Sequence, residues 1–379
     1  MIRSEFSGES SSARSWCERL RAGTPSAQLL LLLGGTETAQ VPGISAAGAT
    51  PASRRLTAAA DAELLLLGPG QGRPHALPPL PAGVSPALIA HVVRRELALD
   101  TLVVDLGCPV APSVPHVQLS QKPARCLSVG AAMAPERVSR LFRLGKTWAR
   151  GWARRPGQPP LVLAECVPGG TSTAQAVLTG LGIEANGLVS GSLRQPAHAL
   201  KAALVEKGLR AAGLWRLRRT GAVDPLELLA AVGDPMQPLA AGMVLAAAAA
   251  GIPVLLAGGS QMAAVLALAL ALAPEEVRPR LVAGVGLATT AWVAGEPGSD
   301  LALLLQRIGS RWRLEPIAYA SGLRFHSCRS RSLRDYEQGY VKEGVGAGGL
   351  ALLWELSGRR LEELSEACDL ACEQLEACT

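Results

Sequence analysis

The sequence predicts an α/β fold, with a doubly wound, mostly parallel sheet. Short apolar runs that end in glycine recur along the chain, and each run is continuous rather than alternating, as in strands covered on both faces. Helix-like segments separate the runs, which gives the β-α-β rhythm of a parallel sheet. Hydrophobic residues make up 49% of the chain but aromatic residues only 3%. The core must therefore be built from aliphatic layers packed close to the backbone.

The apolar runs define the expected strands, and the periodic segments define the expected helices. The expected strands are 28–35, 62–70, 101–107, 160–170, 253–259 and 280–286. The expected helices between them are 85–99, 173–181, 197–207 and 225–231. Ligands of doubly wound sheets bind beyond the carboxyl ends of the strands. The loops that follow these strands are therefore the places where a site is expected.

The stretch from Pro235 to Pro274 contains no charged residue, so its length alone would allow a membrane span. Gly251, Pro253 and the pair Gly258-Gly259 interrupt it where a continuous helix could not tolerate a break. Alanine also contributes little of the insertion energy that a span requires. We expect a buried helix over 239–250, a strand over 251–259 and a helix over 260–273, with no membrane contact.

The length of 379 residues suits one large α/β domain with an accessory region, or two domains. We divide the chain into a polar N-terminal segment (1–27), an α/β domain (28–355) and a C-terminal helix (356–379), the two ends forming a small helical accessory region. The first 28 residues lack the apolar stretch of a signal peptide. The eight cysteines form no CxxC pair, so reduced thiols and a cytoplasmic location are expected.

Charge and cysteine placement argue against two classes of ligand. The net charge is +6, but the basic stretches 140–155 and 210–219 show no convincing clustering on one face or interleaving with aromatics, and they are typical of solvated helix faces or loops. No nucleic-acid partner is therefore expected. Cys368 and Cys372 lie one helical turn apart, with Cys378 further on, but no histidine nearby completes a ligand set. We expect packing residues there, and neither a metal site nor a cofactor.

The segment 161–182 predicts a strand, a glycine turn and a helix start. Free backbone N–H groups at such a start, with hydroxyls beside them, can bind an anion such as a phosphate. The turn and the helix start contain Gly169, Gly170, Thr171, Ser172 and Thr173. An ordinary helix cap with tight packing would give the same pattern, and that alternative stays open.

The segment 253–267 repeats this plan, with Gly258, Gly259 and Ser260 at the turn. Two such loops on neighbouring strands could flank one ligand, although a structural turn is an equal alternative. Asp234 could position a ribose hydroxyl or cap the helix that follows it. The small-residue stretch 41–55 could line a pocket or form a tight loop.

The segment 340–353 places Glu343 among glycines that include Gly344 and Gly346. A carboxylate in a loop with few other side chains is exposed to whatever binds there, as a general base requires. The two glycines would bring backbone close to the same substrate. The alternative role for Glu343 is to cap the helix that begins near Gly349.

Three loops resemble one enzyme family. YVKEGVGAGG resembles the Gly-Glu-Gly-Thr-Gly-Ala loop of nicotinate-nucleotide:dimethylbenzimidazole phosphoribosyltransferases, which assemble the lower-ligand nucleotide of cobamides. AECVPGGTSTA stands in the place of that family's Gly-Glu-Met-Gly-Ile-Gly-Asn-Thr-Thr loop, and MVLAAAAAGIPVLLAGGSQMAAVLAL is similar to its Ala-rich helix and Pro-Val-Leu-Leu-Asp-Gly strand. The opening LLLGGTETAQVPGISAAGATP is closer to a poorly characterised branch. The resemblance covers most of residues 28–355.

The resemblance implies a Rossmann-like fold, a homodimer, and transfer of phosphoribose from nicotinate mononucleotide to an aromatic azole base such as dimethylbenzimidazole. Glu343 matches the glutamate that takes the proton from the incoming base. Glu165 and the Gly169–Thr173 turn would bind the ribotide, with Gly258–Ser260 nearby. The pyridinium leaving group already carries positive charge, so catalysis would consist of orienting two rings and removing one proton.

Two departures from the family pattern leave the acceptor base open. Ala257 stands where the family has the aspartate of its Asp-Gly pair, and Val-Pro-Gly-Gly replaces Met-Gly-Ile-Gly in the first glycine turn. A non-catalytic ribotide-binding protein and a ribotide hydrolase are the alternative functions.

Overall fold

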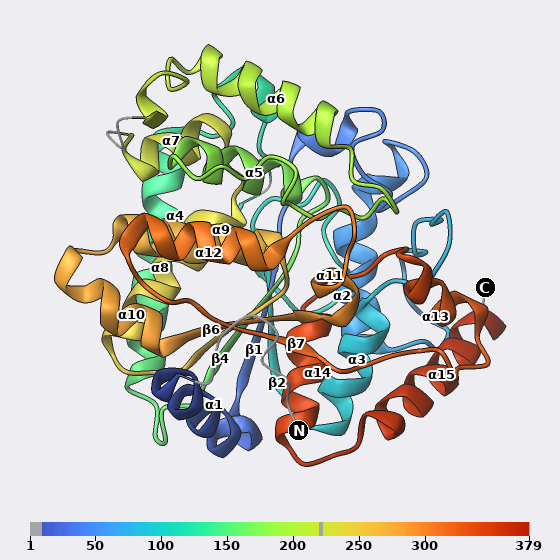
Figure 1. The fold of residues 1–379 in the computed structure, drawn as a ribbon. Helices are drawn as coiled ribbons and strands as arrows, with labels where there is room; N and C mark the ends of the chain where they lie inside the picture. The colour runs from blue at the N-terminus through green and yellow to red at the C-terminus, as the bar shows by residue number, and fades with distance from the viewer. Residues whose placement is uncertain (1–9, 121, 220–222, 379) are drawn as a thin grey trace.

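The computed structural model describes residues 10–120, 122–219 and 223–378, and its centre is a seven-stranded sheet (Figure 1). Every pair of neighbouring strands is parallel, in the order β3-β2-β1-β4-β5-β6-β7. The strands are β1 (Gln28–Leu33), β2 (Asp100–Asp105), β3 (Val117–Gln118), β4 (Leu161–Cys166), β5 (Val254–Ala257), β6 (Val285–Thr290) and β7 (Ile317–Ser321). The strand order reverses between β1 and β4, which is where such sheets open a crevice for ligands. The predicted fold class is confirmed.

Helices cover both faces of the sheet (Figure 1). Over one face lie α4 (Pro135–Ala153), α5 (Gly170–Gly180), α6 (His198–Ala211), α7 (Pro225–Val232), α8 (Met236–Ala249), α9 (Ser260–Leu272), α10 (Arg278–Gly284) and α12 (Leu301–Trp312). Over the other lie α2 (Thr57–Leu67), α3 (Ala87–Glu96), α14 (Ala347–Leu356) and α15 (Leu361–Ala377), with α1 (Ser11–Gly23) and the short α11 (Ala291–Ala294) and α13 (Arg331–Arg334). Each face of the sheet therefore has its own hydrophobic core, and successive side chains of β1 alternate between the two. Leu30 and Leu32 pack in one core, and Leu31 packs in the other.

The uncharged stretch folds as helix α8, strand β5 and helix α9, as expected. α8 has 14 residues and α9 has 13. Within the described part of the chain, no helix is both long and apolar enough to cross a membrane.

Two strand predictions were wrong. Residues 62–67 of the run 62–70 belong to helix α2, and 280–284 belong to helix α10, after which β6 begins. A continuous apolar run cannot distinguish a buried strand from a buried helix, and the residues of α2 from 57 to 65 are all buried. Strands β3 and β7 were not expected.

The two ends of the chain pack against the sheet and its helices. In α1, Trp16 and Leu20 are fully buried, and Trp16 Nε1 donates to the Val254 carbonyl at 3.3 Å. Its ring stacks on Tyr319 at 5.8 Å. In α15, Cys368 and Cys372 are both buried. The domain division stays a prediction, and residues 1–9 and 379 of its terminal segments lie outside the described residues.

Candidate functional site

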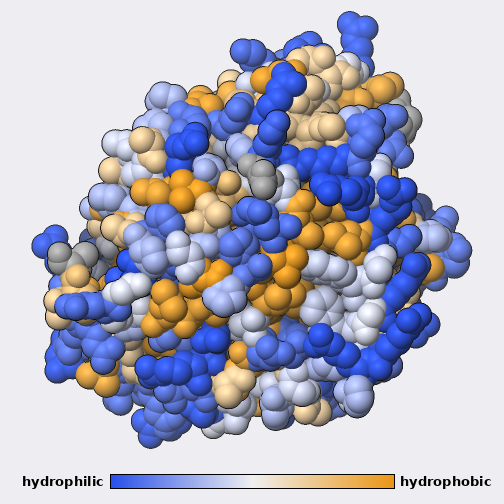
Figure 2. Space-filling view, turned by 180° about the vertical axis from the view of Figure 1, so that it is seen from behind, coloured by the Kyte–Doolittle hydropathy of each residue, from blue (hydrophilic) through white to orange (hydrophobic). Residues whose placement is uncertain are grey.

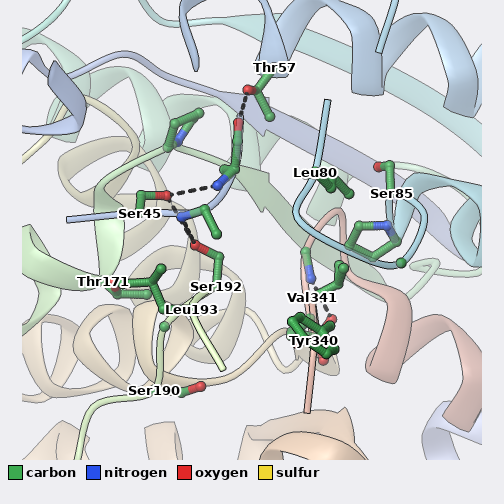
Figure 3. A pocket seen from close by; sticks show the side chains of 18 of the residues that line it. Ser45, Thr57, Leu80, Ser85, Thr171, Ser190, Ser192, Leu193, Tyr340 and Val341 are labelled. Atoms are coloured by element: carbon green, nitrogen blue, oxygen red, sulfur yellow. Dashed lines mark hydrogen bonds between the residues drawn. The ribbon is translucent and has the colours of Figure 1, made fainter. Parts of the chain in front are cut away.

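A cavity of about 630 Å³ opens at the carboxyl ends of the strands, a volume typical of a small-molecule site (Figure 3). Residues directly after β4 and β5 form its floor. Its walls are four segments without regular strands: 45–47, 77–86, 190–195 and 340–344. The segment 45–47 belongs to the small-residue stretch for which a pocket wall was one of two expectations.

Hydrogen bonds tie one wall of the cavity together (Figure 3). Ser192 Oγ accepts from the Ala46 N–H at 2.8 Å and lies 3.0 Å from Ser45 Oγ. Thr57 Oγ1 donates to the Ala47 carbonyl at 2.5 Å. Leu80, Ser85, Tyr340 and Val341 lie on the opposite side in the same view.

Most of the residues that the sequence singled out meet at this cavity. Those that line it are Glu165, Gly169, Gly170, Thr171, Gly259, Ser260, Glu343 and Gly344. Four lie behind its surface: Ser172, Thr173, Gly258 and Gly346. Thr173 Oγ1 donates to Asp234 at 2.5 Å, and Gly346 packs against Ala164. These four shape the turns from behind rather than face the cavity.

The first glycine turn requires glycine at 169, and a side chain at 170 would displace the side chain of Gln261. Gly169 has φ +80°, and a Cβ there would lie 2.9 Å from the Ala39 nitrogen. A Cβ on Gly170 would lie 1.9 Å from Gln261 Oε1. A larger residue at 169 would push the start of α5 away from its neighbours. Backbone forms this end of the cavity, but the N–H groups of Gly170 and Ser172 already donate to the carbonyls of Val167 and Gly169 at 2.8 and 3.0 Å, so an anion would rely on the other N–H groups of this helix start.

The carboxylate of Glu343 accepts four hydrogen bonds from the protein. Oε1 accepts from the N–H groups of Gly344 at 3.1 Å and Gly348 at 3.2 Å. Oε2 accepts from Thr289 Oγ1 and from the Thr290 N–H, both at 3.0 Å. Since Gly348 lies in the first turn of α14, Glu343 caps that helix while its half-buried side chain also lines the cavity. The capping role expected for Glu343 is therefore confirmed, the expectation that it has few partners of its own is wrong, and its role as a general base stays a prediction.

Burial raises the pKa of Glu343, and the four donated hydrogen bonds oppose that rise. The loop that carries it is strained, because three residues other than glycine have left-handed backbone: Val341 at φ +64°, Lys342 at +68° and Val345 at +52°. Such conformations cost about 1–3 kcal/mol each and cluster at functional sites.

Glu165, at the end of β4, is the second carboxyl of the cavity. Its side chain accepts from the Val167 N–H at 2.9 Å. Burial raises its pKa to about 8, and the nearby carboxyls of Asp234 and Glu343 add to the rise. Glu165 therefore holds its proton at neutral pH and can donate a hydrogen bond into the cavity.

A third carboxyl, Asp61, was missed by the sequence analysis. Asp61 accepts from Ser85 Oγ at 2.6 Å and from Cys166 Sγ at 3.3 Å, and all three residues line the cavity. Burial raises the pKa of Asp61 to about 6. The pKa of the Cys166 thiol is raised well above its usual value, mainly by burial, so it stays protonated. Asp61 stands at the edge of the run that was mistaken for a strand, which hid its position.

The sequence also missed the walls at 77–86 and 190–195. The first contains several prolines, and a proline-rich loop, which the structure places between helices α2 and α3, was the one available signal. The second has no pattern of its own. Arg194, in this second wall, is the one basic side chain among the described residues that line the cavity.

Two further predictions concern residues behind the cavity. Asp234 Oδ1 accepts from the Met236 N–H at 3.1 Å, so it caps α8, the commoner of its two expected roles. Ala257 is fully buried, and a Cβ on Gly349 would lie 2.4 Å from its own. A larger side chain at 257, such as the family's aspartate, would displace α14 from this close contact.

The arrangement can bind an anionic group at the glycine turn and can exchange protons through its carboxyls. Three carboxyl groups line the cavity, and burial raises the pKa of each: Asp61, Glu165 and Glu343. Over the ranges given above, no three Cys, His, Asp or Glu side chains are grouped so that they could hold a metal ion.

Comparison with known proteins gives consistent matches. The family model described as phosphoribosyltransferase matches residues 87–291. A UPF0284 protein of Parasynechococcus marenigrum is 53% identical over 372 residues, covering 96% of this chain and 90% of the relative. One of Gloeobacter violaceus is 46% identical over 362 residues, covering 94% of this chain and 90% of the relative.

Two solved structures from Thermus thermophilus share the fold. One is CobT, with a TM-score of 0.57, 19% identity, and coverage of 97% of this chain and 93% of that one. The other is described as a nicotinate-nucleotide-dimethylbenzimidazole phosphoribosyltransferase, with a TM-score of 0.54, 18% identity, and coverage of 97% and 92%.

Proposed function

Since this chain belongs to the phosphoribosyltransferase family whose model matches residues 87–291, we propose that it transfers phosphoribose from nicotinate mononucleotide, or a similar ribotide, to an aromatic azole base. The observation that carries the proposal is the shared cavity of Glu343, Glu165 and the Gly169-Gly170 turn. One cavity thus combines a proton acceptor, a proton donor and an anion site.

The reaction needs one bond exchange and one proton transfer. The bond between C1′ of the ribose and the nicotinate ring nitrogen breaks, and its electron pair returns to that ring. A nitrogen of the azole forms the new bond to C1′, and the proton of the azole N–H moves to Glu343. The departing pyridinium gains electrons and becomes neutral, so orientation and proton removal are the contributions required of the protein.

Glu343 must free an oxygen lone pair to accept that proton. Its four present donors are three backbone N–H groups and one hydroxyl, that of Thr289. The hydroxyl can rotate away, whereas the backbone groups are fixed. Rotation of the Thr289 hydroxyl, which is buried behind the cavity lining, would leave Oε2 with one donor instead of two and so make it the more basic oxygen.

Glu165 would serve as a hydrogen-bond donor to the ribotide. It holds its proton at neutral pH because burial raises its pKa to about 8. A protonated carboxyl can donate to a ribose hydroxyl or to the nicotinate carboxylate without repelling the anionic substrate. The ribotide phosphate would then occupy the start of α5.

The remaining lining favours a flat apolar acceptor. Leu77, Leu80, Val293 and Val341 line the cavity beside the carboxyls. Such surfaces accept an aromatic ring such as dimethylbenzimidazole, and cobamide lower-ligand synthesis is the setting that the resemblance implies.

We propose a cytoplasmic homodimer. The hydrophobic residues that lie among hydrophilic ones across the middle of the face in Figure 2 offer surface for such contact.

Turnover measured with and without an acceptor base distinguishes this proposal from its alternatives. Purified protein is incubated with nicotinate mononucleotide and each of a panel of azole bases, and released nicotinate and phosphoribosylated base are both measured. The proposal expects both products, and only when a base is present. Nicotinate release without a base would identify a hydrolase instead.

One observation favours the non-catalytic alternative. The complete set of donors around Glu343 is also what a purely structural cap would have. A binding protein would bind the ribotide in calorimetry and release no nicotinate with any base, and this result would overturn the transferase proposal.

A further inference from the structure

Lys342, the residue before Glu343, combines a strained backbone with a buried charge. Its φ is +68°, in the left-handed region that residues with side chains rarely occupy, and its side chain is 1% exposed. Neither feature is favourable alone. The contacts of the side chain must therefore hold the residue in place.

Both ends of Lys342 are fixed by hydrogen bonds. Its ammonium donates to Glu296 Oε1 at 2.5 Å and to the Leu193 carbonyl at 2.8 Å. Its own carbonyl accepts from Thr290 Oγ1 at 2.6 Å. The side chain of Glu296 is only 3% exposed, so the ion pair is screened little by solvent.

Leu193 lies in the cavity wall 190–195, which we call the strap. The strap is held at its start by Lys201, whose ammonium donates to the Ser190 carbonyl at 2.7 Å. At its other end the guanidinium of Arg194 lies 5.8 Å from the centre of the Tyr340 ring. Lys342 is thus the inner link between the strap and the loop that carries Glu343.

We infer that Lys342 is a positioning residue: its buried contacts with Glu296 and Leu193 keep the strained loop in the conformation that directs Glu343 into the cavity, and they hold the strap against that loop. The inference rests in part on the proposed function, because its catalytic consequence requires that Glu343 acts as the base. The structural consequence, ordering of both segments, does not.

The competing explanation is an ion pair that stabilises the fold as a whole. A variant that removes only one partner cannot distinguish the two explanations, because it leaves an uncompensated buried charge. The double variant Lys342→Met/Glu296→Gln removes both charges of the pair and keeps the volume similar. Because burial lowers the pKa of the Lys201 ammonium and the carboxylate of Glu296 opposes that fall, Lys201→Met is measured alone to give that residue's own contribution to order in the strap. The matched control is Arg210→Met/Glu206→Gln, which removes an exposed ion pair on α6 that lies outside the cavity lining.

Amide hydrogen exchange of the full chain, without ligand, tests the inference independently of turnover. In the Lys342/Glu296 double variant we expect exchange at 190–195 and 340–346 to rise by about tenfold or more, with the strands unchanged. The control should match the wild type. Unchanged exchange in both segments, or an equal rise throughout the molecule, would overturn the inference.

Kinetics provide the second readout once transferase activity is established. We expect kcat of the double variant to fall about tenfold or more, because Glu343 is misdirected, while ribotide affinity changes by less than about threefold. An equal loss of kcat and affinity would contradict a role through Glu343. If the wild type shows no transferase activity, the proposed function fails, and the exchange result still decides whether Lys342 orders the two segments.

Discussion

The backbone N–H of Val345 donates to the carbonyl of Glu165 at 3.0 Å, so the loop that carries Glu343 is bonded directly to the end of strand β4. This contact joins the segments that carry two of the three carboxyls of the cavity, Glu165 and Glu343, which are far apart in the sequence. Their proximity also contributes to the raised pKa of Glu165. The proposed chemistry depends on this meeting of two loops.

Replacing Glu343 by Gln tests its role as a base. We expect turnover to fall by about 10²–10⁴, the usual contribution of a general base, with ribotide affinity retained. The amide would also face fixed N–H donors, so the melting temperature should drop. Glu355→Gln is the matched control, because Glu355 accepts from Ser321 Oγ and the Gly322 N–H outside the cavity lining. A Glu355 variant as inactive as the Glu343 variant would show that activity follows stability instead.

Thr289→Val tests the assignment of Glu343 as the base. The hydroxyl of Thr289 lowers the pKa of Glu343, so its removal should raise that pKa. Because the base works in its deprotonated form, the acid limb of the profile of kcat/KM against pH should move to higher pH. Thr147→Val, on the exposed side of α4, should leave the profile unchanged. An unmoved acid limb in the Thr289 variant would contradict the assignment.

The raised pKa of Glu165 predicts a pH dependence of stability. The pKa of Glu165 is about 8 in the folded state, whereas the ordinary pKa of a glutamate side chain is 4.5. The folded state therefore binds more protons than the unfolded state between these values, so the free energy of unfolding should decline as pH rises from about 4.5 to 8. Glu165→Gln removes this contribution, and denaturant unfolding at several pH values should give a flatter dependence. If the free energy of unfolding changed equally with pH in the variant and the wild type, Glu165 would have the same pKa in the folded and unfolded states, which would contradict the prediction.

Gly348→Ala tests the close approach of α14 to the sheet. A Cβ at this position would lie 2.0 Å from the carbonyl carbon of Thr289 and 2.2 Å from the nitrogen of Thr290, both backbone atoms. We expect a loss of about 3 kcal/mol or more in the free energy of unfolding, since the backbone must shift. Gly151→Ala, where nothing lies within 4 Å, should be neutral or stabilising by about 0.5–1 kcal/mol. Similar effects of the two substitutions would argue against the tight contact.

The sequence predicted the parts of the molecule that depend on local pattern. Runs such as 28–35 and 253–259 end in glycine and alternate with helices, and this pattern was sufficient for the fold class and for the loops that form the cavity floor. It failed for α2, because an Ala- and Leu-rich segment buried on all sides has the same composition as a buried strand.

The walls of the cavity could not be predicted from local pattern. The strap joins the site through contacts with residues distant in the sequence, such as the bond from Lys342 to the Leu193 carbonyl. Left-handed backbone at Lys342 likewise has no signature in a residue with a long side chain. The glycine turn at 169–170 and Glu343 were found because each carries its signal within a few residues.

The ratio of products tests the central claim most directly. Wild-type protein, nicotinate mononucleotide and dimethylbenzimidazole are incubated together, and nicotinate and the phosphoribosylated base are quantified by mass spectrometry. The account predicts equal amounts of the two products, no nicotinate without the base, and both products formed at least about a hundredfold more slowly with Glu343→Gln. Nicotinate released without any phosphoribosylated base, or unchanged turnover in the Glu343 variant, would contradict it.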